Sequence, residues 1–103
     1  MWVLGITRSH NGAVALTNNG KIISAIQAER ISRVKRQAIM LEEDKVLISK
    51  CVDYCLKEAD IKHDDLQSIA ISTPWDVNYI ENKELFKLIG GSPKDYKGTY
   101  YVP

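Results

Sequence analysis

The dipeptide Asn19-Gly20 is the feature of the sequence that most constrains its fold. It lies between two short apolar runs, 13–17 and 21–27, and both of its residues tolerate the positive φ angles that a type I′ turn requires. Because this turn matches the twist of paired strands, the two runs are predicted to form an antiparallel hairpin. The preceding run, 1–7, is nearly continuous in apolar character, which is typical of a central strand covered on both faces. These residues together predict a three-stranded meander.

The remaining residues alternate between helical and extended patterns. Apolar residues recur at spacings of three and four from Leu47 to Ala59, which predicts an amphipathic helix that ends near Asp60. The three acids at 42–44 suit the positive N-terminal end of this helix. Three shorter elements are predicted further on: a buried strand within 66–72, a helix over 82–89 and a strand over 99–102. The order β-β-β-α-β-α-β predicts one α/β domain, a mixed sheet with helices on its faces.

The composition restricts the class of protein. The 103 residues are 45% hydrophobic and 26% charged, which is ordinary for a globular domain. A net charge of +1 gives no overall attraction to nucleic acid or to an anionic membrane, and the apolar stretches are far too short for a membrane span. We therefore expect a cytoplasmic protein with no nucleic acid and no membrane among its partners. Cys51 and Cys55, four residues apart, are expected to be reduced core thiols.

A basic segment follows the predicted hairpin. Four cations, Arg30, Arg33, Lys35 and Arg36, lie within seven residues, and no acid follows Glu29 there. Phosphate groups require dense positive charge and forked donors, which arginine supplies, so these side chains are candidate anion ligands. Glu29 is expected to pair with one of them and orient it. A solvated basic surface is the alternative, and the lack of interleaved aromatic residues argues against nucleic acid.

Four motifs, in the right order, resemble the NodU/CmcH-type carbamoyltransferases. The first is Leu4-Gly5-Ile6 followed by Ser9-His10-Asn11-Gly12 and a run of small residues, and the second is Asn19-Gly20-Lys21-Ile22. The third is Ala28-Glu29-Arg30-Ile31-Ser32-Arg33-Val34-Lys35, which is similar to the family pattern E-E-R-F-T-R-x-K. The fourth is Tyr54-Cys55-Leu56-Lys57-Glu58-Ala59-Asp60-Ile61 with 65–69 after it. A set of motifs in order is more specific than any one of them.

The resemblance implies a ribonuclease-H-like, actin-like ATPase half-domain, with residues 1–103 as the N-terminal subdomain of a longer chain. The implied parent is an ATP-dependent O-carbamoyltransferase. It moves a carbamoyl group from carbamoyl phosphate, through carbamoyl-adenylate, to a hydroxyl of a small-molecule acceptor. The implied site residues are His10 as the catalytic, proton-handling group, Asn11 and Asp76 as substrate ligands, and Arg30, Arg33 and Lys35 as ligands of the nucleotide or carbamoyl phosphate.

The resemblance also implies a divalent metal, such as iron or magnesium, whose ligands are expected beyond Pro103. The remainder of the parent chain is thus an expected partner, and the 103 residues alone are expected to be inactive. A homodimer is left open. Two other functions stay as alternatives: a fragment of a sugar-kinase-like ATPase, and a non-catalytic module that associates through a sheet face or edge. The first hairpin lacks the acid usual in sugar kinases, which counts against the former.

Overall fold

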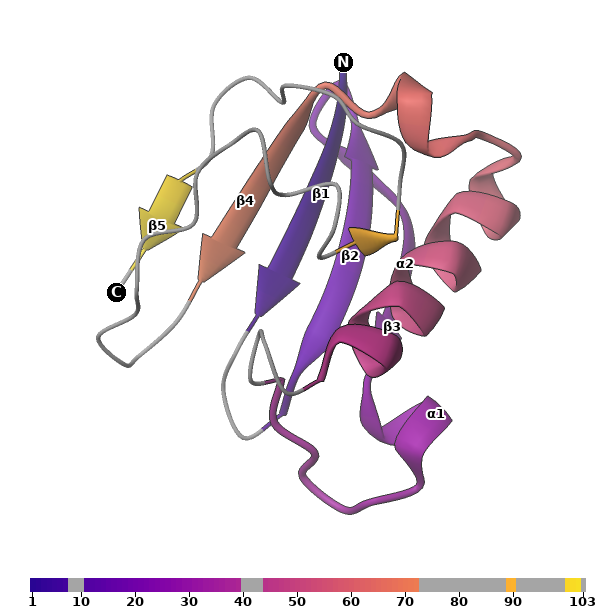
Figure 1. Cartoon of the computed structure of the whole chain (residues 1–103). Coiled ribbons are helices and arrows are strands. Elements are labelled where there is room, and N and C mark those ends of the chain that lie inside the picture. Colours follow the sequence, from indigo (N-terminus) through magenta and orange to yellow (C-terminus); the bar gives the residue numbers. More distant parts are fainter. Residues whose placement is uncertain (8–10, 40–43, 73–88, 91–99, 103) are drawn as a thin grey trace.

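A computed structural model describes residues 1–7, 11–39, 44–72, 89–90 and 100–102 (Figure 1). It is an α/β fold in which five strands form one mixed sheet in the order β3-β2-β1-β4-β5. The elements are β1 (Trp2–Thr7), β2 (Ala13–Asn18), β3 (Lys21–Gln27), α1 (Glu29–Ser32), α2 (Lys45–Ala59), η1 (His63–Asp65), β4 (Ser68–Ser72) and β5 (Tyr100–Val102). None of the described helices is long and apolar enough to cross a membrane.

The predicted hairpin is confirmed. Asn19 and Gly20 have φ angles of 52° and 82°, as a type I′ turn requires, and the turn joins the antiparallel strands β2 and β3. The N-terminal ammonium of Met1 adds to this corner by donating to the side-chain oxygen of Asn19 at 2.6 Å. β1 takes the predicted central place, because it pairs antiparallel with β2 on one side and parallel with β4 on the other.

The register divides the side chains of the sheet into two sets. Leu4 lies opposite Leu16 of β2 and Ile69 of β4, and all three side chains are buried. This side, the helix face, packs against α2, where the Ser24 hydroxyl donates to the carbonyl of Cys55 at 2.8 Å. Because side chains alternate along a strand, the neighbouring residues lie on the other side, which we call the open face because α2 packs on the opposite one. The apolar core is therefore concentrated between the sheet and α2.

The open face carries small side chains. Ala25, Ala15, Gly5 and Ala70 lie opposite one another in a row across β3, β2, β1 and β4. Three of these four residues are half-buried and Ala25 is exposed. β1 was expected to be a central strand covered on both faces. Leu4 and Ile6 of β1 are buried on the helix face, whereas Gly5 on the open face is half-buried.

The helix predicted from Leu47 to Ala59 is α2, and its end at Asp60 is confirmed by the left-handed conformation of that residue. The strands predicted within 66–72 and over 99–102 are β4 and β5. The helix predicted over 82–89 lies outside the described residues except for Ile89, which is buried. Two elements had no counterpart in the prediction, α1 and η1, because four and three residues are too short to show a periodicity.

The two cysteines are unpaired and buried on α2, as predicted. Burial raises the pKa of Cys51 from its ordinary value of 9.0 to about 11, and the neighbouring thiol of Cys55 acts in the same direction. Burial also raises the pKa of Cys55, although a hydrogen bond with the Ser24 side chain opposes this. The folded chain thus holds these protons more tightly than the unfolded chain does, and neither thiol is activated as a nucleophile.

The raised pKa of Cys51 predicts a loss of stability in alkali. The stabilisation is complete below the ordinary thiol pKa of 9.0 and is lost as the pH rises toward about 11, because the unfolded chain releases its proton first. Urea unfolding at several pH values across this interval should therefore show a shallower decline of the unfolding free energy for Cys51→Ala than for the unchanged chain. Parallel declines in the two chains would contradict this assignment.

Candidate functional site

The basic segment closes onto the start of β2 and forms a loop, residues 28–37, which we call the basic loop. The N–H of Gly12 donates to the carbonyl of Gln37 at 2.9 Å, and the carbonyl of Gly12 accepts from the N–H of Ala28 at 2.8 Å. Gly12, the residue just before β2, therefore holds both ends of the loop through its backbone groups. The loop is anchored at the end of the sheet where β1, β3 and β4 finish, since Thr7 lies opposite both Ala13 and Ser72.

Gly12 is required at this contact for steric reasons. A Cβ atom on Gly12 would lie 2.5 Å from Cγ1 of Ile39 and 3.0 Å from the backbone nitrogen of the same residue. Ile39 is fully buried, so it has no room to give way. This close approach of Ile39 accompanies the hydrogen bond between Gly12 and Gln37, which lies two residues before Ile39.

The backbone of the basic loop is strained at two arginines. Arg33 ends α1 with a φ of 62°, and Arg36 follows with a φ of 58°. The left-handed region costs a residue with a Cβ atom about 1–2 kcal/mol, and glycine normally takes such positions. Strain of this kind is found at functional sites more often than elsewhere, so two strained arginines in one loop support a ligand-binding role.

Among the residues that the structure describes, no acid forms an ion pair with the positive charges of the loop. Arg30, Arg33, Lys35 and Arg36 are all exposed, and none of their side chains forms an ion pair with another residue in the described part of the chain. Glu29 was expected to pair with one of these side chains. Its carboxylate instead accepts from the backbone N–H of Arg36 at 2.7 Å. The loop thus presents four cations at one end of the sheet that have no ion-pair partner within the described ranges.

Two hollows lie on the open face beside the loop. The larger, of about 270 Å³, is lined by Arg30, by Gln27 and by alanines of β2 and β3. The smaller, of about 170 Å³, is lined by Gly5, Thr7 and other residues of β1, β2 and β4. The two hollows share Ala13 and Ala15, so they form one shallow trough with Arg30 at one of its walls.

The structure brings together most of the predicted site residues that it describes. Arg30, Arg33 and Lys35 share the basic loop, and Asn11 is exposed next to Gly12, where that loop closes. His10 and Asp76, the predicted catalytic and substrate-binding residues, lie outside the described residues. Sequence reasoning missed the part played by Gly12, and its position at the start of a predicted strand was the only local indication of a close approach.

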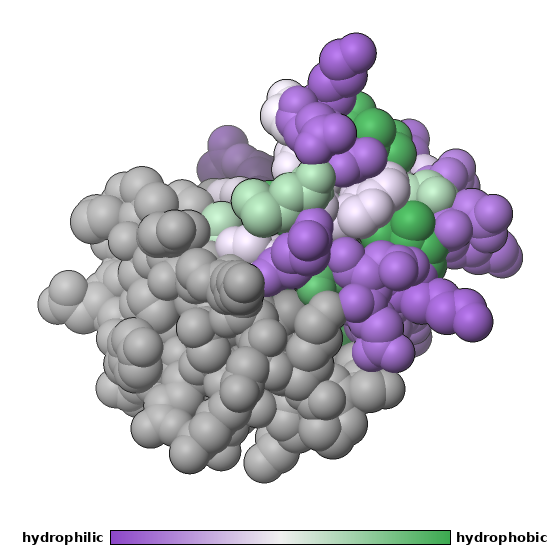
Figure 2. Space-filling view, turned by 90° about the horizontal axis from the view of Figure 1, so that it is seen from above, coloured by the Kyte–Doolittle hydropathy of each residue, from purple (hydrophilic) through white to green (hydrophobic). Residues whose placement is uncertain are grey.

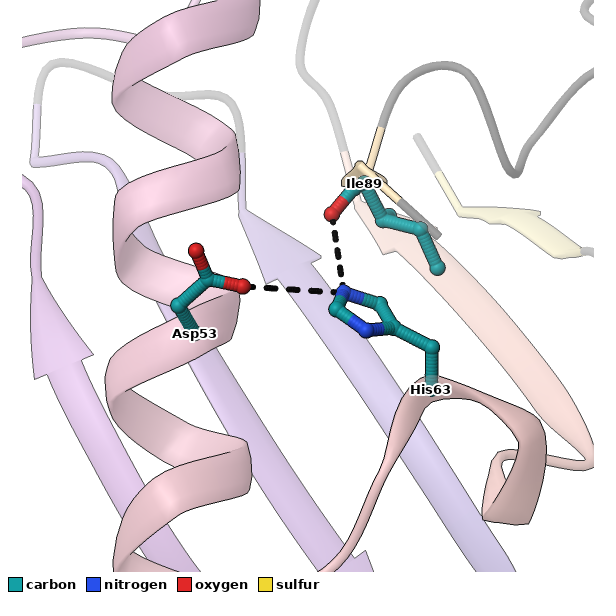
Figure 3. A network of polar contacts seen from close by, with 3 residues as sticks. All are labelled: Asp53, His63 and Ile89. Carbon is teal, nitrogen blue, oxygen red and sulfur yellow. Dashed lines mark hydrogen bonds and ion pairs between the residues drawn. The ribbon is translucent and has the colours of Figure 1, made fainter. Parts of the chain in front are cut away.

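A second polar group lies far from the basic loop. It is centred on His63, which is half-buried. Its Nε2 donates to the carbonyl of Ile89 at 3.3 Å and lies 3.6 Å from a carboxylate oxygen of Asp53 (Figure 3). These contacts join η1, α2 and Ile89 beside a hollow of about 420 Å³. η1, which supplies His63, lies at the end of the molecule opposite α1 (Figure 1), and we assign these contacts a structural role.

Figure 2 shows the end of the molecule near the N-terminus. Its described surface is mostly hydrophilic, with hydrophobic side chains scattered among the polar ones (Figure 2). No group of three or more His, Cys, Asp or Glu side chains that could hold a metal ion occurs in the described ranges. The described residues therefore do not fit a metal centre.

Comparison with known proteins gives two matches. The family model described as "Carbamoyltransferase N-terminus" matches residues 2–99. The curated relative Nodulation protein NolNO of Sinorhizobium fredii is 31% identical over 64 residues, which are 62% of this chain and 8% of that relative. The matched residues thus span less than a tenth of the length of that relative.

The steric role of Gly12 predicts a contrast between two glycines. Gly12→Ala should lower the unfolding free energy by about 1–3 kcal/mol, because the added methyl group forces Ile39 and the basic loop away from β2. Gly5→Ala is the matched control, since a Cβ atom there would meet only the carbonyl oxygen of Ala15, at 3.8 Å. Urea unfolding of both variants measures the difference, and equal losses would refute the steric assignment.

Proposed function

Because this chain belongs to the carbamoyltransferase family and matches the N-terminal region of that family, we propose that it is the part of an O-carbamoyltransferase that holds the phosphate-bearing substrates. The observation that carries the proposal is the basic loop. Four exposed cations, which form no ion pair with any acid that the structure describes, lie at the carboxyl ends of β1, β3 and β4, where ligands collect in open α/β sheets. The strand order and the antiparallel β2 support a ribonuclease-H-like, actin-like half-domain.

The proposed ligands of the loop are ATP and carbamoyl phosphate, both of which carry phosphate. Arg30, Arg33 and Lys35 bind their oxygens, and the forked guanidinium groups also orient them. Arg30 serves the trough directly, because it lines the larger hollow. Asn11 lies beside the closure of the loop and is proposed to contact the acceptor, with Asp76 in the same role.

The proposed reaction of the parent protein transfers the carbamoyl group from carbamoyl-adenylate to an acceptor hydroxyl. The hydroxyl oxygen forms a bond to the carbamoyl carbon, the bond from that carbon to the adenylate phosphate oxygen breaks, and AMP leaves with the electron pair. The hydroxyl proton must be removed as the new bond forms, and His10 is proposed to accept it. We also propose that the parent protein binds a divalent metal through ligands that follow Pro103, and that it is located in the cytoplasm.

Removal of the loop cations is expected to weaken anion binding. We expect Arg33→Ala with Lys35→Ala to raise the dissociation constant for ATP by about tenfold or more, since each charge-assisted contact contributes about 1.5–3 kcal/mol. The matched control is Lys21→Ala with Lys57→Ala, which also removes two exposed cations, one from the other end of β3 and one from the last turn of α2. NMR titration of the 103-residue chain measures the affinities. Equal losses in the control and in the loop variant would show that only net charge matters.

The open face favours a second, non-catalytic function, which is association with the remainder of the parent chain. Its row of small residues lets another backbone approach closely, and it is nearly free of charged side chains among the described strand positions. The length of the matched relative supports a large remaining chain as the occupant. A homodimer is the competing outcome.

Ala15→Arg tests this association. The arginine would project from the open face, so it should lower the unfolding temperature of the parent protein while changing the stability of the 103-residue chain by less than about 0.5 kcal/mol. Thermal unfolding of both proteins gives the comparison. An unchanged parent would argue against the docked face, and a concentration-dependent dimer of the short chain that Ala15→Arg dissociates would identify a second copy as the occupant.

A further inference from the structure

We propose that Glu29 is a positioning residue that holds the basic loop in the shape that binds anions. The identity of the ligand rests on the proposed function, whereas the positioning role rests on contacts within the loop. Glu29 is the first residue of α1 and is half-buried, and it precedes all four cations. It is the one acid in a stretch that is otherwise basic.

Glu29 contacts both of the strained arginines through their backbones. Its carbonyl oxygen accepts from the N–H of Arg33 at 2.8 Å, and its carboxylate oxygen Oε1 accepts from the N–H of Arg36 at 2.7 Å. Both arginines have left-handed φ angles that residues with a Cβ atom avoid. One residue therefore holds the two backbone positions that are least favourable by themselves.

The choice of partner keeps the cations available. A carboxylate beside four cations would ordinarily form a salt bridge with a guanidinium group and remove one donor from the site. Here the carboxylate accepts from a backbone N–H, and no ion pair of Arg30, Arg33, Lys35 or Arg36 occurs in the described part of the chain. Glu29 thus orders the loop without occupying a side chain that is needed for the ligand.

Charge and geometry make opposite predictions about this residue. On charge alone, removal of an acid from a basic loop strengthens its attraction for anions. If Glu29 holds the loop in place, its removal weakens binding, because the ligand must then order the loop itself. A comparison of two variants with the same net charge separates these effects.

Glu29→Ala removes both the charge and the side-chain acceptor, and Glu29→Gln removes the charge but keeps an oxygen at the same reach. NMR titration of the 103-residue chain with inorganic pyrophosphate at low salt should give a dissociation constant about tenfold higher for Glu29→Ala than for Glu29→Gln. Glu29→Gln should bind at least as tightly as the unchanged chain. Equal affinities of the two variants would overturn the proposal.

Limited trypsin digestion provides a readout without a ligand, because Arg33 and Arg36 are themselves cleavage sites. Cleavage at these residues under native conditions should be about tenfold faster in Glu29→Ala than in the unchanged chain or in Glu29→Gln, since proteolysis reports local opening. Unchanged cleavage in Glu29→Ala would overturn the positioning role. Faster cleavage in a chain that does not bind pyrophosphate would instead refute the proposed function and leave the positioning role standing.

The fold is expected to survive these substitutions, because α1 has no buried residues. Unchanged amide shifts in β1, β2 and β4 would verify this for each variant. Should Glu29→Ala unfold, Glu29→Asp serves instead, because it keeps the charge and shortens the reach by one methylene group. Cleavage of Glu29→Asp at the rate of the unchanged chain would then overturn the proposal.

Discussion

The pairing of β1 with two different neighbours is the constraint on which the rest of the structure depends. β1 is antiparallel to β2 and parallel to β4, so its register fixes which side chains of three strands lie on each face. A shift by one residue would exchange the buried leucines and isoleucines of the helix face with the glycine and alanines of the open face. The placement of α2 over the apolar side follows from this register, and so does the trough on the other side.

The same sheet supplies the anchor for the candidate site. Gly12 stands at the beginning of β2, where its two backbone groups receive both ends of the basic loop. Without a Cβ atom it also lets Ile39 pack against the strand. The loop is therefore attached to a rigid edge and does not depend on its own short helix for its position. This arrangement explains how two arginines are kept in a strained backbone conformation at the surface.

The two faces of the sheet and its two ends hold different parts of the structure. The helix face holds the apolar core, including two thiols whose raised pKa keeps them inert. The carboxyl ends of β1, β3 and β4 hold the basic loop, and the open face joins that loop through Arg30. The contacts of His63 with Asp53 and Ile89 secure the opposite end. The proposed anion site and the proposed association surface are thus next to each other.

The sequence by itself determined the features that depend on neighbouring residues. The Asn19-Gly20 turn, the strands and α2 were predicted because turn chemistry and the periodicity of apolar residues are local properties. The core placement of the cysteines followed from the same periodicity, and the four motifs were sufficient to identify the family. The charged segment was also evident, because its four cations lie within seven residues of the sequence.

Only the tertiary structure decided how those cations are held. The closure of residues 28–37 on Gly12 joins positions 16 and 25 residues apart, and no periodicity reports such a contact. The partner of Glu29 was mispredicted, because the sequence shows charges but not the left-handed turn that aims the N–H of Arg36 at the carboxylate. The row of small residues on the open face likewise exists only through strand register. These features rest on pairings between distant segments, and three-dimensional packing alone brings those segments together.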